Sequence, residues 1–231
     1  TEGTAMRYVI DPPPTAAIPV RGGGLFPVRR VYCIGRNYAA HAVEMGGDPN
    51  REPPFFFQKN PDDLDPSGRF PYPRRSANVH HEVELLVALA RGGEEIPADQ
   101  ALACVWGYAV AIDMTRRDLQ DEAKKLQRPW EVAKAFARSA PVGELVPAAA
   151  IGHPSRGAIT LAVDGALRQS GDLAQMIWKV PEIVATLSQY FTLAPGDVIL
   201  TGTPAGVGPV ERGQVMEAAI EGVGAIRVEV V

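Results

Sequence analysis

The sequence lacks both a disulfide framework and any long hydrophobic run. Only 2 of its 231 residues are cysteine, and Cys33 and Cys104 both stand in apolar, strand-like segments, so we expect buried thiols rather than a disulfide-stapled secreted domain. Apolar runs such as residues 85–90 fall far short of the ~18 residues that would span a membrane. The start of the chain shows no basic segment followed by an apolar stretch. These features predict a cytoplasmic protein with no membrane partner.

Clusters of positive charge and phosphate-binding loops are also missing. Acidic side chains outnumber Lys and Arg by 27 to 23, and no basic helix is interleaved with aromatic residues, which argues against nucleic acid as a partner. The glycine-rich stretch TGTPAGVGPV, residues 201–210, has neither the Lys-Ser/Thr pair of a phosphate-binding loop nor the third glycine of a dinucleotide site. We interpret it as a tight turn at the exit of a strand.

The chain is 46% hydrophobic, enough for a substantial core, and its pattern indicates an α+β fold. Strands are predicted at 31–35, 54–59, 79–90 and 101–113, with a hairpin at 157–169, further strands after 196, and helices at 37–46, 114–127 and 180–191. This order lacks regular βαβ alternation and favours a mixed or curled sheet. We expect an N-terminal extension over 1–27, of which 1–5 is an expression remnant, and a single domain over 28–231. The irregular connection over residues 46–78 of this domain is typical of a binding loop or lid.

Glu82 and Glu84 stand two residues apart inside the apolar strand predicted at 79–90. Strand side chains alternate faces, so both carboxylates point the same way from Cα atoms ~6.6 Å apart. Two buried carboxylates repel each other and lose hydration, which forces a proton onto one of them unless a cation lies between them. Mg²⁺ or Mn²⁺ is the simplest solution, since the neighbouring His80 and His81 do not complete a zinc motif. The alternative is that both glutamates lie on the solvent face of an edge strand.

Asp113 and the pair His41 and Glu44 are the next candidates. Asp113 ends an apolar strand and could be a third oxygen ligand or, alternatively, the N-cap of the following helix. His41 and Glu44 stand three apart on a short predicted helix, where the carboxylate would raise the basicity of the imidazole and suit it to take a proton from water. The alternative is an ordinary solvent-exposed His-x-x-Glu pair.

Three further polar residues follow Asp113 in the chain. Lys134 stands among apolar residues, where its ammonium could stabilise a developing enolate or, alternatively, reach out to the surface. Arg117 and Gln120 lie one turn apart on the polar helix and could face the same cation and an anionic substrate, because Arg is suited to grip a carboxylate. For this helix the alternative is a solvated charged face.

Six stretches occur in an order that resembles the fumarylacetoacetate hydrolase family, in particular its acylpyruvate hydrolases. They are CIGRNYAAHAVEMG, FFFQK, HHEVELLVAL, AIDMTRRDLQ, PWEVAKAF and TGTPAGVGPV, and the resemblance runs from about Val28 to the C-terminus. It implies a mixed β-roll with short peripheral helices, assembled as a homodimer. It also implies one Mg²⁺ or Mn²⁺ per subunit, held by Glu82, Glu84 and Asp113.

The resemblance further implies three groups of side chains around that ion: a water-activating pair, a lysine near the enolate, and substrate contacts. In this sequence they are His41 and Glu44, then Lys134, then Arg117, Gln120 and Thr203. The water-activating pair would be carried on a lid, formed by about residues 36–78, that orders over bound substrate.

The implied reaction is metal-dependent hydrolysis of a carbon–carbon bond in an acylpyruvate, a 2,4-dioxo acid. Fumarylpyruvate, an intermediate of gentisate catabolism in which it yields fumarate and pyruvate, is the expected substrate. The alternatives are hydrolysis of acetylpyruvate, decarboxylation of oxaloacetate, and a non-catalytic protein that binds a metal or a carboxylic acid. A fumaryl group ends in a second carboxylate, for which the candidate cations are Arg36, Arg51, Lys59 and Arg69.

Overall fold

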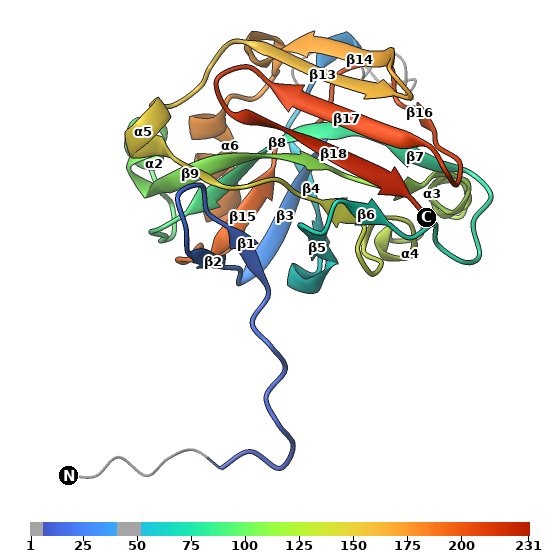
Figure 1. Ribbon diagram of the computed structural model, residues 1–231. Coiled ribbons are helices and arrows are strands. Elements are labelled where there is room, and N and C mark those ends of the chain that lie inside the picture. The colour runs from blue at the N-terminus through green and yellow to red at the C-terminus, as the bar shows by residue number, and fades with distance from the viewer. Residues whose placement is uncertain (1–6, 41–51) are drawn as a thin grey trace.

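The computed structural model describes residues 7–40 and 52–231, and its centre is a six-stranded mixed sheet (Figure 1). Its strand order is β12-β9-β8-β15-β3-β4, with bounds Val146–Pro147, Val105–Ile112, Val83–Leu89, Asp197–Leu200, Arg30–Gly35 and Phe55–Lys59. β15 pairs with β3 in parallel and with β8 antiparallel. The predictions of strands at 31–35 and 54–59 are confirmed. The strand predicted from residue 101 begins only at Val105, because the preceding residues form helical turns.

A five-stranded sheet packs against the central sheet and crosses it in Figure 1. Its order is β14-β13-β17-β18-β6, with bounds Ala166–Asp172, Ala158–Val163, Val215–Ile220, Gly224–Val230 and Arg69–Phe70. The predicted hairpin is confirmed as β13 and β14. It turns at Asp164 and Gly165, whose φ values of 50° and 77° are those that a two-residue hairpin turn requires.

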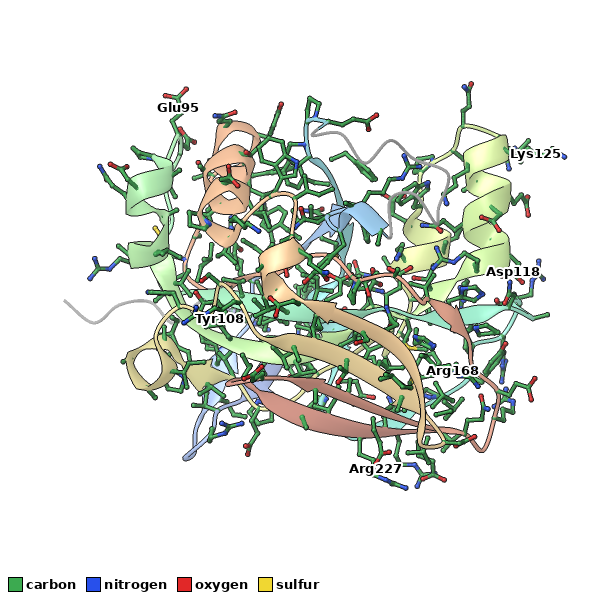
Figure 2. The ribbon with its side chains drawn as sticks, turned by 90° about the horizontal axis from the view of Figure 1, so that it is seen from above. Glu95, Tyr108, Asp118, Lys125, Arg168 and Arg227 are labelled. Atoms are coloured by element: carbon green, nitrogen blue, oxygen red, sulfur yellow. The ribbon has the colours of Figure 1, made fainter. Side chains whose placement is uncertain are left out.

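Short strands and helices surround the two large sheets. The smaller sheets are β10-β7-β16 (Thr115–Arg116, Val79–His81, Gly208–Pro209), β1-β2 (Ala17–Pro19, Leu25–Pro27) and β11-β5 (Ala140–Pro141, Leu64–Asp65). The α-helices are α2 (Ala98–Ala101), α3 (Arg117–Lys125), α4 (Glu131–Lys134), α5 (Ala148–Ile151) and α6 (Val180–Tyr190), and 3-10 turns occupy Pro61–Asp63, Leu102–Cys104 and Leu173–Gln175. In Figure 2, Asp118 and Lys125 mark α3 at one side of the molecule, opposite Glu95. The expectation of an α+β fold with mixed sheets and short peripheral helices is confirmed.

Glu82 lies where the chain passes from one sheet to another. The prediction of one continuous strand over 79–90 is wrong in this respect, because β7 ends at His81 and β8 begins at Val83. β7 pairs with β10 and β16, whereas β8 pairs with β9 and β15. Glu82 belongs to neither strand, although its backbone oxygen accepts a hydrogen bond of 2.8 Å from the amide of Asp113.

Both faces of β8 are buried. Leu85 and Val87 face the core between the two large sheets, while Leu86 and Ala88 face a second core cluster that is closed by the hairpin of β1 and β2. Residues of the expected N-terminal extension thus take part in packing from β1 onward. In the ranges that the structure describes, no helix is long and apolar enough to cross a membrane.

Candidate metal centre and substrate pocket

Three carboxylates converge at one end of β8. Glu84 is the second residue of β8, Glu82 lies just before that strand, and Asp113 follows the last residue of the antiparallel neighbour β9. One oxygen from each residue lies within 4.8 Å of the others, and the exposed fractions are 5%, 2% and 0% for Glu82, Glu84 and Asp113. The solvent-face alternative for the two glutamates is therefore wrong. The N-cap alternative for Asp113 is also wrong, since α3 begins at Arg117.

The environment of Glu84 disfavours negative charge. Burial raises the pKa of Glu84 well above its ordinary value, and the neighbouring carboxylates of Asp113 and Glu82 raise it further. Among the described residues its backbone partner is the amide of Gly202, which donates a hydrogen bond of 2.7 Å to Oε2. Without an added cation, these surroundings therefore favour the protonated form of Glu84.

Lys134 lies between two of the carboxylates. Its Nζ is 2.9 Å from Glu82 Oε2 and 2.8 Å from Asp113 Oδ2, and it donates a third bond of 2.7 Å to the hydroxyl of Thr115. Burial lowers the pKa of Lys134, but the two carboxylates outweigh burial and the net shift is upward. With 2% of the residue exposed, the alternative of a lysine reaching the surface is wrong.

Lys59 contacts the carboxylate cluster from the buried side, through Asp113. The sequence did not indicate this role. Its Nζ is 2.7 Å from Asp113 Oδ1, donates to Ser139 Oγ at 2.9 Å, and also bonds the backbone oxygens of Met114 and Lys134. The side chain is completely buried. Lys59 is consequently wrong as a candidate for a distal substrate carboxylate, because its ammonium is used inside the protein.

Arg117 and Gln120 share one face of α3, as predicted. Arg117 bonds Glu82 Oε1 through Nη2, the Gln120 amide oxygen at 2.5 Å through Nη1, and His80 Nδ1 at 3.4 Å through Nε. Burial, followed by the charge of Arg117, lowers the pKa of His80 to about 4, so His80 is neutral and can accept that bond. The solvated-face alternative is wrong for these two residues, of which 5% and 3% are exposed. The guanidinium keeps further N–H donors for a ligand.

Gln169 fixes the hydroxyl of Thr203. The amide N–H of Val83 donates to Gln169 Oε1 at 3.1 Å, and Gln169 Nε2 donates to the Pro204 backbone oxygen at 2.9 Å. Because a backbone N–H can only donate and a carbonyl can only accept, these two bonds settle which way the amide points. Nε2 therefore donates to Thr203 Oγ1 at 2.7 Å, which leaves the Thr203 proton for a ligand in the pocket.

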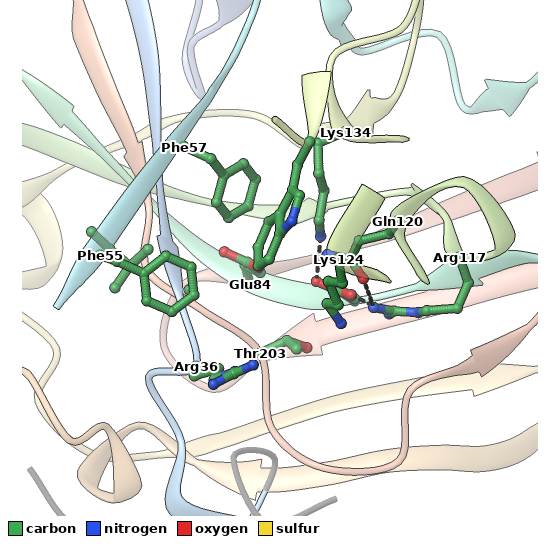
Figure 3. A pocket seen from close by; sticks show the side chains of 13 residues that line it. Arg36, Phe55, Phe57, Glu84, Arg117, Gln120, Lys124, Lys134 and Thr203 are labelled. Carbon is green, nitrogen blue, oxygen red and sulfur yellow. Dashed lines mark hydrogen bonds and ion pairs between the residues drawn. The ribbon is translucent and has the colours of Figure 1, made fainter. Parts of the chain in front are cut away.

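Most of these side chains line one pocket (Figure 3). The predicted residues among those that line it are Glu82, Glu84, Lys134, Arg117, Gln120, Thr203 and Arg36. Residues not identified from the sequence are Phe55, Phe57, Trp130 and Lys124. Lys124 follows Gln120 by four residues, so the helical period that joined Arg117 to Gln120 could also have identified it.

Four candidates from the sequence remain. Arg69 is exposed on β6 and does not line this pocket, so it is wrong as a candidate for the distal carboxylate. His41, Glu44 and Arg51 lie outside the described residues, as does most of the helix predicted at 37–46. Asn37, the first residue of that predicted helix, is buried and donates through Nδ2 to the backbone oxygens of Thr201 and Trp178.

The donor set fits a divalent cation. All three ligand residues supply oxygen, which suits the hard ions Mg²⁺ and Mn²⁺ better than soft metals. A divalent ion would also remove the need for the Glu84 proton, since it would replace that proton's charge at the centre of the cluster.

Comparison with known proteins agrees with this picture. The family model for the fumarylacetoacetate (FAA) hydrolase C-terminal region matches residues 30–231. The crystal structure of a fumarylpyruvate hydrolase from Pseudomonas aeruginosa, in complex with Mn²⁺ and pyruvate, is 52% identical in sequence. It superposes with a TM-score of 0.95, covering 97% of this chain and 99% of that one. For a putative fumarylpyruvate hydrolase from Burkholderia cenocepacia the identity is 48%, the TM-score 0.92, and the coverage 97% and 98%.

A curated relative of different activity is the mitochondrial oxaloacetate tautomerase of Arabidopsis thaliana. It is 41% identical over 201 residues, which are 87% of this chain and 90% of the plant protein. The match of the family model over most of the chain, together with these relatives, establishes that the chain belongs to the fumarylacetoacetate hydrolase family.

Proposed function

We propose that this protein is a Mg²⁺- or Mn²⁺-dependent acylpyruvate hydrolase that splits fumarylpyruvate into fumarate and pyruvate, as a step of gentisate breakdown. The observation that carries the proposal is the buried carboxylate triad, of which Glu82 and Glu84 line the pocket, in a chain that is 52% identical to a fumarylpyruvate hydrolase crystallised with Mn²⁺ and pyruvate. The donors around the triad suit a 2-oxo acid, because Arg117, Gln120 and Thr203 offer N–H and O–H groups to its carboxylate.

The residues would divide the reaction among them. A divalent ion held by Glu82, Glu84 and Asp113 supplies Lewis-acid stabilisation of the negative charge that develops on the pyruvate oxygens. Lys134 lies beside the same carboxylates and would stabilise the charge of the departing pyruvate enolate.

We assign activation of water to His41 and Glu44. Both would belong to a lid of about residues 36–78, which is part of a single catalytic domain over 28–231. Water adds to the acyl carbonyl carbon, the bond from that carbon to C3 of pyruvate breaks, and C3 takes up a proton. We also propose that the enzyme acts as a cytoplasmic homodimer, to be tested by light scattering and cell fractionation.

Oxaloacetate is the second candidate substrate, favoured by relatives such as the plant tautomerase at 41% identity. Tautomerisation or decarboxylation of oxaloacetate needs the same floor of the pocket but no attacking water. We propose hydrolysis first because the identity is higher to a fumarylpyruvate hydrolase, at 52%, and to a putative one, at 48%.

The test is turnover by the metal-stripped and the Mn²⁺-loaded protein on fumarylpyruvate, acetylpyruvate and oxaloacetate. We expect hydrolysis that disappears with chelator and returns with Mn²⁺. In His41→Ala hydrolysis should fall by orders of magnitude while Mn²⁺ binding persists. Metal-dependent turnover of oxaloacetate alone would support the second candidate, and the absence of turnover on all three would indicate a binding protein.

A further inference from the structure

Among the described residues that line the pocket, Arg36 and Lys124 are cations that do not pair with the carboxylate cluster. The other two lining cations, Lys134 and Arg117, both pair with Glu82. Arg36, by contrast, forms no ion pair with any carboxylate in residues 7–40 and 52–231. Its guanidinium lies over the Phe55 ring, 5.9 Å from the centroid. An unpaired guanidinium on a pocket wall is a group suited to an anionic ligand.

Lys124 is the second of these cations. Its nearest carboxylate in the described chain is Asp121, 3.9 Å away on the same helix and with a side chain that is 61% exposed. Such an exposed contact contributes little. Burial lowers the pKa of Lys124, and the positive charges of Arg117 and Arg36 act in the same direction. A bound anion would relieve this repulsion.

Arg36 and Lys124 are placed by elements that also build the floor of the pocket. Lys124 lies one turn beyond Gln120 on α3, and Arg36 directly follows β3. The φ of Arg36 is 54°, in the left-handed region that non-glycine residues rarely adopt, so the direction of its side chain is set by an uncommon backbone conformation. Both residues are half-buried, unlike the buried triad, and therefore lie toward the solvent end of the pocket. Figure 3 shows both side chains among those that line the pocket.

Aromatic rings form the wall near these cations. The Trp130 ring meets Phe55 edge to face at 5.6 Å and Phe57 at 5.8 Å between centroids, and Lys124 Nζ lies 5.5 Å from the centroid of the Trp130 ring. Flat apolar walls suit a planar conjugated acyl chain better than a hydrated polar one.

We infer that Arg36 and Lys124 form a second carboxylate-binding subsite, which takes the distal carboxylate of a dicarboxylic acylpyruvate. This inference rests on the proposed function, since it assumes that the pyruvate half occupies the triad end of the pocket. The substrate is then held at both ends, with its unsaturated chain along the aromatic wall. An acyl group that ends in methyl offers no carboxylate to either cation.

The experiment compares kcat/KM for fumarylpyruvate with kcat/KM for acetylpyruvate, which lacks the distal carboxylate. Arg36→Gln should lower the ratio of the two values about 10- to 100-fold, the effect of losing a charged hydrogen bond. Lys124→Gln should lower it by about three- to tenfold, because a partly exposed charge is screened. Arg36→Lys keeps the charge and should recover part of the ratio. Lys125→Gln, on the exposed side of the same helix, is the matched control and should leave the ratio at the wild-type value.

A binding measurement separates failure of the subsite from failure of the proposed function. Fumarate and crotonate differ by one carboxylate against one methyl group, and calorimetry on the Mn²⁺-loaded protein should show tighter binding of fumarate, with the difference reduced in Arg36→Gln. If the wild type hydrolyses neither acylpyruvate, the proposed function is overturned, and the fumarate–crotonate difference still decides the subsite. An unchanged kinetic ratio in active Arg36→Gln, or equal binding of the two acids by the wild type, would overturn the subsite.

Discussion

Lys59→Met tests whether the carboxylate cluster depends on a buried ammonium. Methionine keeps a long unbranched side chain but removes the ion pair of 2.7 Å to Asp113 and the bonds to Ser139 and to two backbone oxygens. Removing one partner of a fully buried ion pair costs about 3–5 kcal/mol of unfolding free energy, and here the loss should lie at the lower end of that range, because Asp113 keeps its ion pair with Lys134. That loss is a large share of the stability of an ordinary domain.

The assay for Lys59→Met is urea denaturation of the metal-free protein in the presence of a chelator. Lys125→Met is the matched control and should stay within about 0.5 kcal/mol of the wild type, because Lys125 is exposed. In the double variant with Asp113→Asn the two losses should not add, and the shortfall of about 0.5–3 kcal/mol measures the pair itself. A loss below about 1 kcal/mol in the single variant would refute the view that Lys59 compensates the cluster.

Three residues around the triad give the further predictions. At a pH below the ordinary glutamate range Glu84→Gln should keep the metal-free stability within about 1 kcal/mol of the wild type, because Glu84 is then protonated in both the folded and the unfolded state; at neutral pH the variant should be the more stable of the two. At neutral pH it should also abolish the gain of about 2.7 kcal/mol that Mn²⁺ gives at a hundredfold excess over Kd, and thermal denaturation reads both effects. Because the folded state raises the pKa of Glu84, the stability of the metal-free wild type should fall as pH rises from the ordinary glutamate range through the raised pKa. A pH profile of Glu84→Gln with the same slope would contradict this. Gln169→Leu should raise KM for acylpyruvates about tenfold, with little change in Mn²⁺ affinity measured by calorimetry, because Thr203 is the pocket-lining residue that loses its bond to Gln169. The variant also loses the bonds to Val83, His81 and Pro204, which should lower its stability but not its metal affinity. An unchanged KM would remove Gln169 from substrate positioning. Gly202→Ala should cost about 1–3 kcal/mol in urea denaturation, since φ is 97° and the new Cβ would lie 2.7 Å from Cβ of Asn37; wild-type stability would show that the loop can relax.

The triad could be predicted from the sequence because its signals are local. Two glutamates in a buried apolar run, and an aspartate at the end of the next one, are informative without knowledge of the fold. The break at Glu82 could not be predicted in the same way. It arises because β7 and β8 pair with different strands, and pairing partners are set by tertiary structure rather than by the run itself.

The supporting residues were missed because their partners are distant in the chain. Lys59 reaches Asp113, 54 positions further along the chain, and Gln169 bonds Val83, which lies 86 positions before it. Lys59 ends a strand of aromatic residues, where a lysine is equally compatible with solvent or with a ligand. Its burial is decided by tertiary contacts: β4 contacts α4, and the Lys59 ammonium bonds the turn that follows β9.

The contrast between a buried floor and a partly exposed end of the pocket has a consequence for how this enzyme can change. Replacing Arg36 or Lys124 changes a half-buried side chain, whereas replacing Glu84 or Asp113 changes the buried interior of the protein. Variation can therefore accumulate where the acyl group is read while bond cleavage stays intact. Directed-evolution libraries aimed at new acylpyruvates should be concentrated at these two positions and their aromatic neighbours.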